Sequence, residues 1–581
     1  MAGDKDQVAP VAQAPAAESS DLTGQAVPTR RLPSLRLPTR AELWTWGPVA
    51  VLAIATAVQL ALLVSFERGF WFVMDDWGFL LDRDAYWLAP RNGHWSTLTT
   101  AIYRVLFEFF GLRHYLPYAL VTTLFHLGLS WAWYAVLRRA GSPRAGALLG
   151  AWFVLFLGVG GDALMYSAAM NHLGSLLLGA IALMRVVDQR RTAPTILLLV
   201  GSVAFSNTGI AAVAMVVLFV AMENGLRRAF ALVAVPAVAY VVWFIAFAGE
   251  SLDQQAPKEI WGYLRVPGQA LAGLASSAGK AVGQPTLGPV ILAVLVLMTL
   301  VLPARSKVLR HLAWSGLASS YLVALILAAG RQWTEIDTGR YVYFMACFLA
   351  PVVVHCALGL WGFVNAPRAV GAGLLGVVLM IHALNGVIAE REFAQQWRMI
   401  SNAWAPRIGG MLEAMDAGEE PIESFSGDYY NAELTPERIV DPETRAALPT
   451  FESTAQGRID AESMFMVKVG KASVVAQRNN NVSQIAGSFA TPVESVPGCR
   501  THKGQTAQPA LVIGTGQGNE VTVTSTSTEL TTTLQRLGGP PSPTRKWSVA
   551  PGPVVISTTA KDAMLFVSFN GGVGDYRICT G

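Results

Sequence analysis

The sequence predicts an α-helical polytopic membrane protein with a β-sandwich domain at its C-terminus. Hydrophobic residues make up 52% of the 581 residues and charged residues only 14%, which is too apolar for a water-soluble chain. Eleven apolar runs follow one another up to residue 388, and runs of about 18 or more such residues are typical of membrane helices. Beyond residue 395, polar residues and Gly and Pro dominate, and apolar residues begin to alternate, which indicates strands.

The positive charges give these runs an orientation. Arginines gather in alternate connections, as at Arg190–Arg191 and Arg227–Arg228, whereas the loops 161–171 and 206–209 contain no Lys or Arg. This alternation predicts a cytoplasmic N-terminus in the cell (plasma or inner) membrane, with loop 67–115 and the C-terminal region on the outer side. The runs lie near residues 46–66, 116–137, 145–160, 173–187, 193–205, 210–222, 229–248, 288–303, 312–330, 341–363 and 369–388.

Composition divides the chain into four parts. Residues 1–42 are rich in Ala, Pro and Gln and are expected to be a disordered cytoplasmic tail. Residues 43–392 form the transmembrane domain, and residues 393–440 a linker with short helices. Residues 441–581 alternate as strands do and are long enough for a β-sandwich with its own core.

The fifth and sixth runs are short. Thirteen helical residues span about 20 Å, against about 30 Å of hydrocarbon. Basic pairs flank the two runs on the same side, so an even number of crossings is required, and we expect a helical hairpin with Ser206-Asn207-Thr208-Gly209 at its tip. Short helices are tolerated where they line a water-filled cavity. A thinner bilayer, or extension of the helices by polar residues, is the alternative.

The outer loop 67–115 contains a predicted amphipathic helix over Thr97–Phe110. Leu98, Ile102 and Val105 share one face of this helix, and Arg104 lies on the other. Such a helix is expected in the membrane interface. A second interfacial helix is expected near Trp261 in the outer loop 249–287.

Two adjacent carboxylates, Asp75 and Asp76, follow the first run in the stretch Trp71-Phe72-Val73-Met74-Asp75-Asp76-Trp77. Acids at the mouth of a membrane bundle are costly to hold there and indicate a functional site. A carboxylate can take the proton of an attacking hydroxyl, so one acid is expected to be catalytic and the other structural or metal-binding. The alternative is a capping role at a helix N-terminus.

Cationic and aromatic groups on the outer side indicate an anionic partner. Arg340 begins the tenth run, directly before Tyr341, and Arg331 ends the ninth run. Arginine binds phosphate through two parallel hydrogen bonds, so these residues are candidate phosphate contacts together with His94. Ion pairing of Arg340 with an acid of the same loop, and an interfacial anchor at His94, are the alternatives.

Weaker signals concern a metal and a disulfide. Asp162, with His172 nearby, is a candidate ligand for a divalent cation such as Mg²⁺, Mn²⁺ or Ca²⁺. Cys499 and Cys579 can pair if their domain lies outside the cell, which would close a loop of 80 residues and stabilise the fold by about 4 kcal/mol. The other two cysteines lie in an apolar run and are expected to be inert packing residues.

These features together resemble the GT-C superfamily of integral-membrane glycosyltransferases. The resemblance rests on the acid pair in the first outer loop, the interfacial helix after it, the Arg340-Tyr341 start of a late run and the outer C-terminal domain. It implies that Asp76 or Asp75 is the catalytic base, that Arg340 contacts the phosphate, and that the donor is a polyprenyl-phosphate sugar. Among members, the layout is nearest to cell-wall arabinofuranosyltransferases, whose outer β-domain is similar to a carbohydrate-binding module.

The resulting prediction is an inverting glycosyltransferase. It moves a sugar, with arabinofuranose as the expected one, from a polyprenyl-phosphate donor to a cell-envelope polysaccharide on the outer face of the membrane. The expected partners are that donor, that acceptor and membrane lipids. Nucleic acid is not expected, because the net charge is only +4 and the basic residues lie in loops. The alternatives are a transporter or flippase of lipid-linked sugars and a non-catalytic glycan-binding assembly protein.

Overall fold

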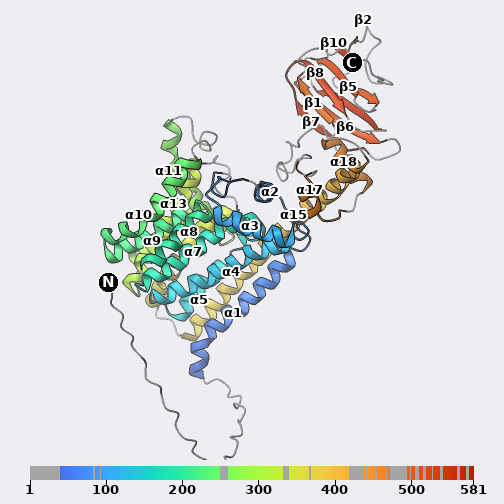
Figure 1. The fold of residues 1–581 in the computed structure, drawn as a ribbon. Helices are drawn as coiled ribbons and strands as arrows, with labels where there is room; N and C mark the ends of the chain where they lie inside the picture. Colours follow the sequence, from blue (N-terminus) through green and yellow to red (C-terminus); the bar gives the residue numbers. More distant parts are fainter. Residues whose placement is uncertain are drawn as a thin grey trace, which may run out of the picture. The chain divides into compact units, whose positions relative to one another are not determined.

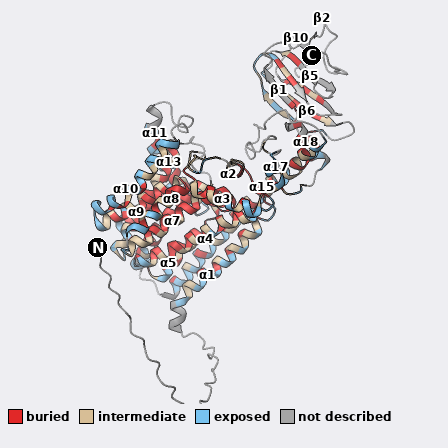
Figure 2. Ribbon diagram, in the orientation of Figure 1, coloured by how far each residue is buried: buried red, intermediate tan, exposed pale blue. Residues whose placement is uncertain are grey.

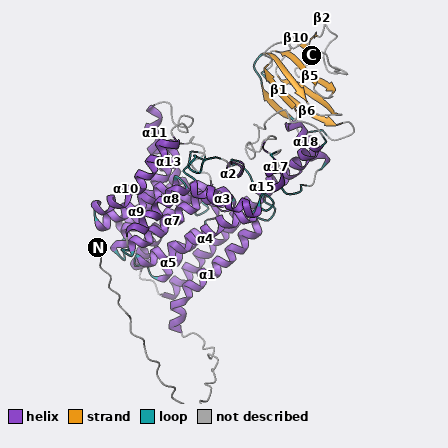
Figure 3. Cartoon of the chain, viewed as in Figure 1, coloured by secondary structure: helices purple, strands orange, loops and turns teal. Residues whose placement is uncertain are grey.

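The computed structural model contains a bundle of apolar helices followed by a domain of two β-sheets (Figure 1). Within the described part of the chain, the strands all lie from Val467 onward, and Figure 3 shows them gathered in one domain. Residues 1–47 and 48–581 form separate compact units. The structure describes residues 40–82, 85–91, 93–190, 192–248, 260–330, 339–364, 368–417, 438, 441–451, 454–465, 467–471, 494–496, 499–503, 510–514, 519–525, 528–536, 541–542, 544–558, 563–570 and 575–580. All but the last three residues of the predicted tail 1–42 therefore lie outside the described part.

The helices of the bundle coincide with the eleven predicted runs. Eight described helices are long and apolar enough to cross a membrane, and three shorter apolar helices accompany them. How many of them cross stays a prediction. The helices are α1 (Arg40–Phe66), α4 (Leu116–Arg139), α5 (Arg144–Leu155), α7 (Met170–Val187), α8 (Thr192–Phe205), α9 (Thr208–Asn224), α10 (Leu226–Trp243), α12 (Gly288–Val301), α13 (Lys307–Gly330), α14 (Gly339–Val364) and α15 (Arg368–Asp416).

Short elements connect these helices. The helices α2 and α3 lie in the loop 67–115, and α11 precedes α12. The other short elements are about one turn long. In chain order, these connecting elements are α2 (Asp75–Leu81), α3 (Thr97–Phe110), η1 (Gly158–Gly160), α6 (Gly161–Met165), η2 (Ser167–Ala169), the π-helix η3 (Phe244–Ala248), α11 (Ile260–Lys280) and η5 (Pro285–Leu287). The interfacial helix expected near Trp261 falls within α11.

Burial separates an interior from an outer surface. Helices α5 and α14 are mostly buried, whereas α10 and α15 turn most of their surface outward, and Figure 2 shows exposed residues along α1 and α10. The exposed side chains include Leu197, Phe230 and Val301, each at least 70% exposed. So much exposed apolar surface is unfavourable in water and suits contact with lipid.

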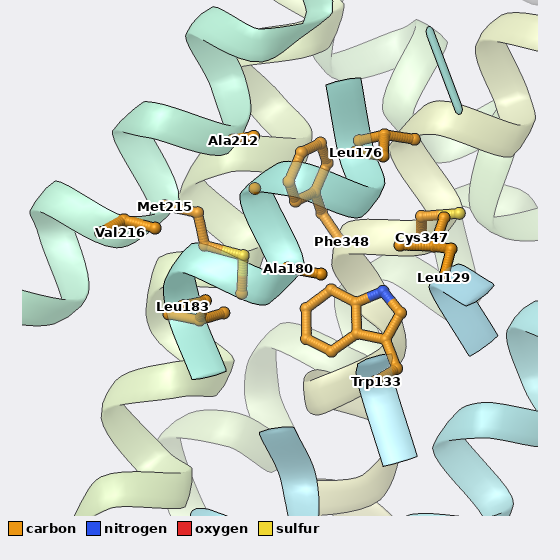
Figure 4. A pocket seen from close by; sticks show the side chains of 11 residues that line it. Leu129, Trp133, Leu176, Ala180, Leu183, Ala212, Met215, Val216, Cys347 and Phe348 are labelled. Atoms are coloured by element: carbon orange, nitrogen blue, oxygen red, sulfur yellow. The ribbon is translucent and has the colours of Figure 1, made fainter. Parts of the chain in front are cut away.

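The interior of the bundle is closely packed. Figure 4 shows Trp133 of α4, Leu176 of α7, Met215 of α9 and Phe348 of α14 converging on a cavity of about 10 Å³. A single water molecule needs about 10–15 Å³ of this kind of space, so the cavity offers no room for a ligand. Cys347 lines it as a buried free thiol, as expected of a packing residue.

The predicted amphipathic helix is confirmed as α3, with the same bounds. Tyr103 and Phe107 lie on its buried face, whereas Val105 and Phe109 are 56% and 78% exposed. An exposed apolar stripe beside a bundle of apolar helices suits a position in the bilayer interface. Arg104 anchors the preceding loop, because its guanidinium donates to the Ala85 carbonyl at 2.6 Å.

The predicted hairpin of α8 and α9 is also confirmed, and its tip contacts the loop 67–115. The Asn207 side-chain amide donates to the Gly93 carbonyl at 3.0 Å. Its carbonyl oxygen accepts the Trp95 backbone N–H at 3.4 Å. The Trp95 ring stacks on Trp243 of α10, with ring centroids 5.6 Å apart. The segment before α3 is therefore fixed by two other parts of the bundle.

Some polar side chains buried between helices form hydrogen bonds across the helix interfaces. Gln59 of α1 donates to Glu390 of α15 at 2.7 Å, and both are fully buried. His126 of α4 and Tyr343 of α14 lie 2.7 Å apart, and the other ring nitrogen of His126 meets the Leu155 carbonyl at 3.1 Å. A buried polar group without a partner costs more than such a pair, so these contacts specify which helices are neighbours.

The C-terminal domain consists of two antiparallel sheets that share one hydrophobic core. One sheet has the strand order β1-β8-β5-β10-β3-β2 and the other β4-β9-β6-β7. Val523 and Ile556 of the first sheet and Leu534 and Val567 of the second belong to the same buried cluster. The strands are β1 (Val467–Lys471), β2 (Glu494–Val496), β3 (Cys499–Lys503), β4 (Ala510–Gly514), β5 (Asn519–Ser525), β6 (Glu529–Arg536), β7 (Arg545–Ser548), β8 (Gly552–Thr558), β9 (Ala563–Asn570) and β10 (Asp575–Thr580).

Helices join this domain to the bundle. Two helices, α17 (Pro442–Ala447) and α18 (Ala455–Phe465), precede β1, and α15 continues without a break through residue 393, where the linker is expected to begin. The α17 segment touches the outer loop, because the Leu112 backbone N–H donates to the Ala447 carbonyl at 3.1 Å. The expected domain boundaries and a carbohydrate-binding role stay predictions.

The register of the first sheet bears on the expected disulfide. Strands β3 and β10 pair so that Cys499 and Cys579 stand directly opposite each other. Opposed residues of antiparallel strands have Cα atoms about 4.5–5.5 Å apart, which a disulfide can span. Their side chains lie outside the described part, so the bond stays a prediction.

We predict that the protein folded in an oxidising environment has two free thiols. Alkylation of the denatured, unreduced chain should modify Cys347 and Cys356 only, and reduction should expose two more of the four cysteines. Loss of the bond in Cys499→Ser should destabilise the β-domain by about 4 kcal/mol in the loop-entropy estimate. Four reactive thiols before reduction would contradict the pairing.

Candidate active site

The acid pair occupies the first turn of α2, where the backbone is strained. Met74, the residue before the helix, has a φ angle of +50°, which non-glycine residues rarely adopt. Such strain persists only where surrounding contacts enforce it, and it often marks functional sites. Here the contacts are aromatic: Trp71 lies edge-on to Trp77 with ring centroids 5.0 Å apart, and Phe72 packs on Tyr118 at 4.9 Å. These ring contacts thus fix the segment of backbone that carries the two carboxylates.

Asp76 is fully buried and accepts three hydrogen bonds. Its Oδ1 accepts the Tyr103 hydroxyl of α3 at 2.5 Å and the Ser167 hydroxyl of η2 at 2.7 Å. Its Oδ2 accepts the Val73 backbone N–H at 3.1 Å. This carboxylate therefore joins α2 to α3 and to η2 in the loop 161–171.

Burial dominates the electrostatics of Asp76. Removal from water raises the pKa of the Asp76 carboxyl from 3.8 to about 7, and the negative charge of Asp75 adds to the rise. The hydrogen bonds from Tyr103, Ser167 and the backbone oppose it, because they stabilise the ionised form. A second buried acid, Glu67, stands just past the end of α1, and burial raises its pKa to about 8.

Asp75 has different surroundings. Its side chain is half-buried, and its backbone N–H donates to the Tyr166 hydroxyl at 2.7 Å. The guanidinium of Arg340 interacts electrostatically with Asp75 and with Tyr166. The structure therefore brings the first-loop acid and the predicted phosphate-binding arginine, 265 residues apart in sequence, into one site.

Close packing at the start of α14 fixes Arg340. A Cβ atom on the preceding residue, Gly339, would lie 2.5 Å from the Val159 carbonyl oxygen and 2.7 Å from Oδ1 of Asp162. Only glycine allows this approach. Asp162 also interacts electrostatically with the Arg340 guanidinium. The arginine is thus positioned by η1 and α6, and the η2 turn that follows them carries Ser167 beside Asp76.

The predicted residues His94, His172 and Tyr341 meet at one cavity, which we call the histidine cavity. Its described lining includes His94 and His172, Asn207 and Thr208 of the hairpin tip, Tyr341 and Phe344 of α14, and apolar side chains of α13. The two imidazole rings are edge-to-face, 5.6 Å apart. The Arg340 guanidinium lies 5.3 Å above the Tyr341 ring, so the cavity adjoins the arginine.

The two candidate metal ligands do not share a described contact. Asp162 faces the positive charge of Arg340, whereas Nδ1 of His172 meets the Thr208 hydroxyl at 2.7 Å and the Ser206 hydroxyl at 2.9 Å. In the described part of the chain, no three His, Cys, Asp or Glu side chains gather as metal ligands would. A divalent cation stays a prediction. Arg331, the other candidate phosphate contact, lies outside the described residues.

Three partners of the acids were not predicted from sequence. Tyr103, Tyr166 and Ser167 each bind Asp75 or Asp76. For Tyr103 the sequence did contain an indication, because this residue stands on the non-lipid face of the amphipathic helix. The indication for Tyr166 and Ser167 was weaker: they lie in the loop 161–171, which contains no Lys or Arg.

Comparison with known proteins gives remote likenesses only. No protein-family model matches the chain, and no curated protein matches it. The chain is similar to the crystal structure of ArnT from Cupriavidus metallidurans bound to undecaprenyl phosphate, over 70% of this chain and 90% of that one, with 12% identity and a TM-score of 0.44.

A second likeness is to the crystal structure of an oligosaccharyltransferase of Archaeoglobus fulgidus tethered with an acceptor peptide containing the NVT sequon. It covers 65% of this chain with 12% identity and a TM-score of 0.38. The chain spans 59% of the length of that protein. Neither likeness concerns an arabinofuranosyltransferase, so that specificity stays a prediction.

We predict a pH-dependent stability that originates at Asp76. Between its ordinary pKa of 3.8 and its folded pKa of about 7, the folded chain binds more protons than the unfolded chain, so stability falls as the pH rises through this interval. In Asp76→Asn this component is absent. The unfolding temperature of the purified protein in detergent should therefore fall less between about pH 4 and about pH 7 in the variant than in the wild type. Glu108→Gln, at an exposed acid of α3, is the matched control. Equal pH profiles for Asp76→Asn and the wild type would contradict the assignment.

We also predict that Gly339→Ala destabilises the site. The added methyl group meets the Val159 carbonyl and the Asp162 carboxylate, and such overpacking costs about 1–3 kcal/mol. Gly373→Ala in α15 is the control, since a Cβ there meets nothing within 4 Å and alanine favours a helix by about 0.5–1 kcal/mol. Thermal unfolding of both variants checks the prediction, which is wrong if Gly339→Ala is as stable as Gly373→Ala.

Proposed function

We propose that the protein is an inverting glycosyltransferase that moves a sugar from a polyprenyl-phosphate donor to a hydroxyl of a cell-envelope glycan. One observation carries the proposal: a half-buried carboxylate, Asp75, and a positioned guanidinium, Arg340, interact electrostatically at the end of the bundle that is predicted to be outside. Glycosyl transfer from a lipid phosphate needs a base for the acceptor and a cation for the departing phosphate. We propose arabinofuranose as the transferred sugar and a cell-envelope glycan as its acceptor.

Asp75 is the better candidate for the base. Both carboxylate oxygens of Asp76 accept hydrogen bonds from the protein, and this side chain is fully buried. Asp75 is half-buried and close enough to Arg340 to interact with it. We therefore assign Asp76 the role of a positioning residue that holds the first turn of α2.

The reaction would proceed in one displacement. The Asp75 carboxylate takes the acceptor hydroxyl proton while the hydroxyl oxygen attacks the anomeric carbon from the face opposite the phosphate. The bond between that carbon and the phosphate oxygen breaks, and the phosphate leaves with the electron pair. Arg340 stabilises the negative charge that develops on it. No step passes through a metal ion.

A groove on the bundle suits the lipid part of such a donor. It has a volume of about 760 Å³ and is lined by apolar side chains of α11, α12 and α13, among them Leu274, Leu297 and Leu317. An isoprenoid chain would bury apolar surface there at roughly 25 cal/mol per Å². The β-domain would hold the acceptor glycan in this scheme.

The test supplies purified protein with a panel of radiolabelled polyprenyl-phosphate sugars and a glycan acceptor. We expect transfer from at least one donor. Asp75→Asn should reduce turnover by about 10²–10⁴-fold, since general base catalysis contributes about that much. Arg340→Ala should reduce it by about 10²–10³-fold, comparable to loss of one charge-stabilising group.

Two variants outside the site serve as controls. Glu108→Gln and Arg113→Gln remove exposed charges of the same outer loop and should keep full turnover. Full turnover in both Asp75→Asn and Asp76→Asn would exclude the mechanism. It would favour a non-catalytic assembly protein or a transporter, for which these acids are dispensable.

A further inference from the structure

We propose that a crevice between η1, the end of α11 and α15 binds the headgroup of an anionic glycerophospholipid. We call it the headgroup crevice. It has a volume of about 220 Å³, and one water molecule needs about 10–15 Å³ of this kind of space, so it has room for a phosphate group with its neighbouring atoms. The bound lipid is neither donor nor acceptor, and the inference does not depend on glycosyl transfer.

Three segments that are far apart in the sequence form the walls of the crevice. Val159 comes from η1, Lys280 from the end of α11, and His382 and Asn385 from α15. None of its described lining residues is Asp or Glu. Lys280 ends a helix of the predicted outer loop 249–287, on the side where the positive-inside pattern disfavours a basic residue. Its charge there indicates an anionic ligand.

Asn385 gives a second, independent indication. It lies within the last apolar run, on the same stripe of α15 as Ile381 and Ile388, which are each 54% exposed. No other residue of the described chain forms a hydrogen bond with its side-chain amide. An amide that faces hydrocarbon without a partner is costly, and such residues on membrane helices commonly mark binding sites. A lipid phosphate would supply the missing acceptor.

The turn after α11 brings the amide and the ammonium to the same crevice. The Gln284 backbone N–H donates to the Gly279 carbonyl at 2.8 Å and closes this turn around Lys280. A Cβ atom on Gly283, in the same turn, would lie 3.7 Å from Nδ2 of Asn385. Ammonium and amide groups are both hydrogen-bond donors, and the free oxygens of a phosphate diester are acceptors.

The remaining walls are fixed and mainly apolar. The Nε2 atom of His382 donates to the Phe153 carbonyl at 3.0 Å, and its ring stacks on the Phe153 ring with centroids 5.4 Å apart. Phe156 and Pro285 add apolar surface. These walls suit the glycerol carbons next to a phosphate, because a small free anion would leave their apolar surface uncovered.

The position along α15 also suits a headgroup. His382 and Asn385 precede the predicted end of the run at residue 388 by six and three residues, which is about 9 and 5 Å of helix. They therefore lie near the boundary between hydrocarbon and headgroups. The exposed side chains of Ile381 and Leu384 continue the surface from the crevice and can contact acyl chains. A zwitterionic lipid would bring a second cation next to Lys280, so an anionic lipid is favoured.

Occupancy of the crevice should stabilise the bundle. Val159 lines the crevice, and its carbonyl oxygen would lie 2.5 Å from a Cβ atom on Gly339. A lipid that contacts η1 therefore supports the segment that packs against the start of α14. Because the ligand binds the folded chain only, the unfolding temperature should rise with its concentration.

The test titrates delipidated full-length protein in detergent micelles with dioleoylphosphatidylglycerol or with dioleoylphosphatidylcholine. We expect the anionic lipid to raise the unfolding temperature in a saturable manner, and native mass spectrometry to show one retained copy per chain. Lys280→Gln and Asn385→Leu should each weaken this binding about 10-fold, as expected for loss of one hydrogen bond to a charged group. Arg265→Gln, which removes an exposed charge of the same helix, is the matched control and should bind as the wild type does.

A second pair of variants covers a failure of Lys280→Gln to fold. Ala389→Leu adds volume to the crevice from α15 and should weaken binding of the anionic lipid. Ala383→Leu makes the same change at another half-buried position of α15, which does not line the crevice, and should leave binding unchanged.

Three results would overturn the proposal. Equal effects of the two lipids, or equal binding by Lys280→Gln and Arg265→Gln, would show that no anion-specific site exists. A rise in unfolding temperature with inorganic phosphate alone, lost in Lys280→Gln, would identify a site for a free anion. Undecaprenyl phosphate that displaces the phospholipid, with the same dependence on Lys280 and Asn385, would assign the crevice to the carrier lipid. None of these measurements requires turnover, so each leaves the proposed transferase to its own test.

Discussion

A desolvated carboxylate organises the end of the bundle that carries α2 and α3. Asp76 is fully buried, and its charge is stabilised by hydrogen bonds from Tyr103, Ser167 and the Val73 backbone N–H. Those donors come from three segments: the turn before α2, α3 and η2. Each segment is therefore held by the requirement that a buried acid be hydrogen-bonded.

A second constraint is close approach between backbones. The start of α14 comes so near to Val159 and Asp162 that only glycine fits at residue 339. A similar contact joins η1 to α15, since a Cβ on Gly158 would lie 1.9 Å from the Gly386 carbonyl oxygen. These contacts place Arg340 next to the segment that contains η1 and α6. The residues that follow α6, Tyr166 and Ser167, bind Asp75 and Asp76. The site is thus assembled by small residues as much as by charged ones.

The different roles proposed for Asp75 and Asp76 follow from their different surroundings. Two adjacent carboxylates differ because α2 turns one toward the interior and leaves the other half-exposed beside a guanidinium. In the proposed mechanism the buried acid therefore has a positioning role and the half-exposed acid a chemical one.

The sequence by itself determined the membrane class, the eleven apolar helices, the bounds of α3 and the α8–α9 hairpin. These follow from local periodicity, length and charge placement, which need no knowledge of distant contacts. Tertiary structure alone decided which acid is buried, that Arg340 interacts electrostatically with Asp75 and that His94 and His172 share a cavity with Tyr341. Those facts depend on segments up to 265 residues apart, so only packing of the helices could supply them. The same holds for Cys499 and Cys579, whose possible pairing was a matter of composition until the sheet register set them opposite each other.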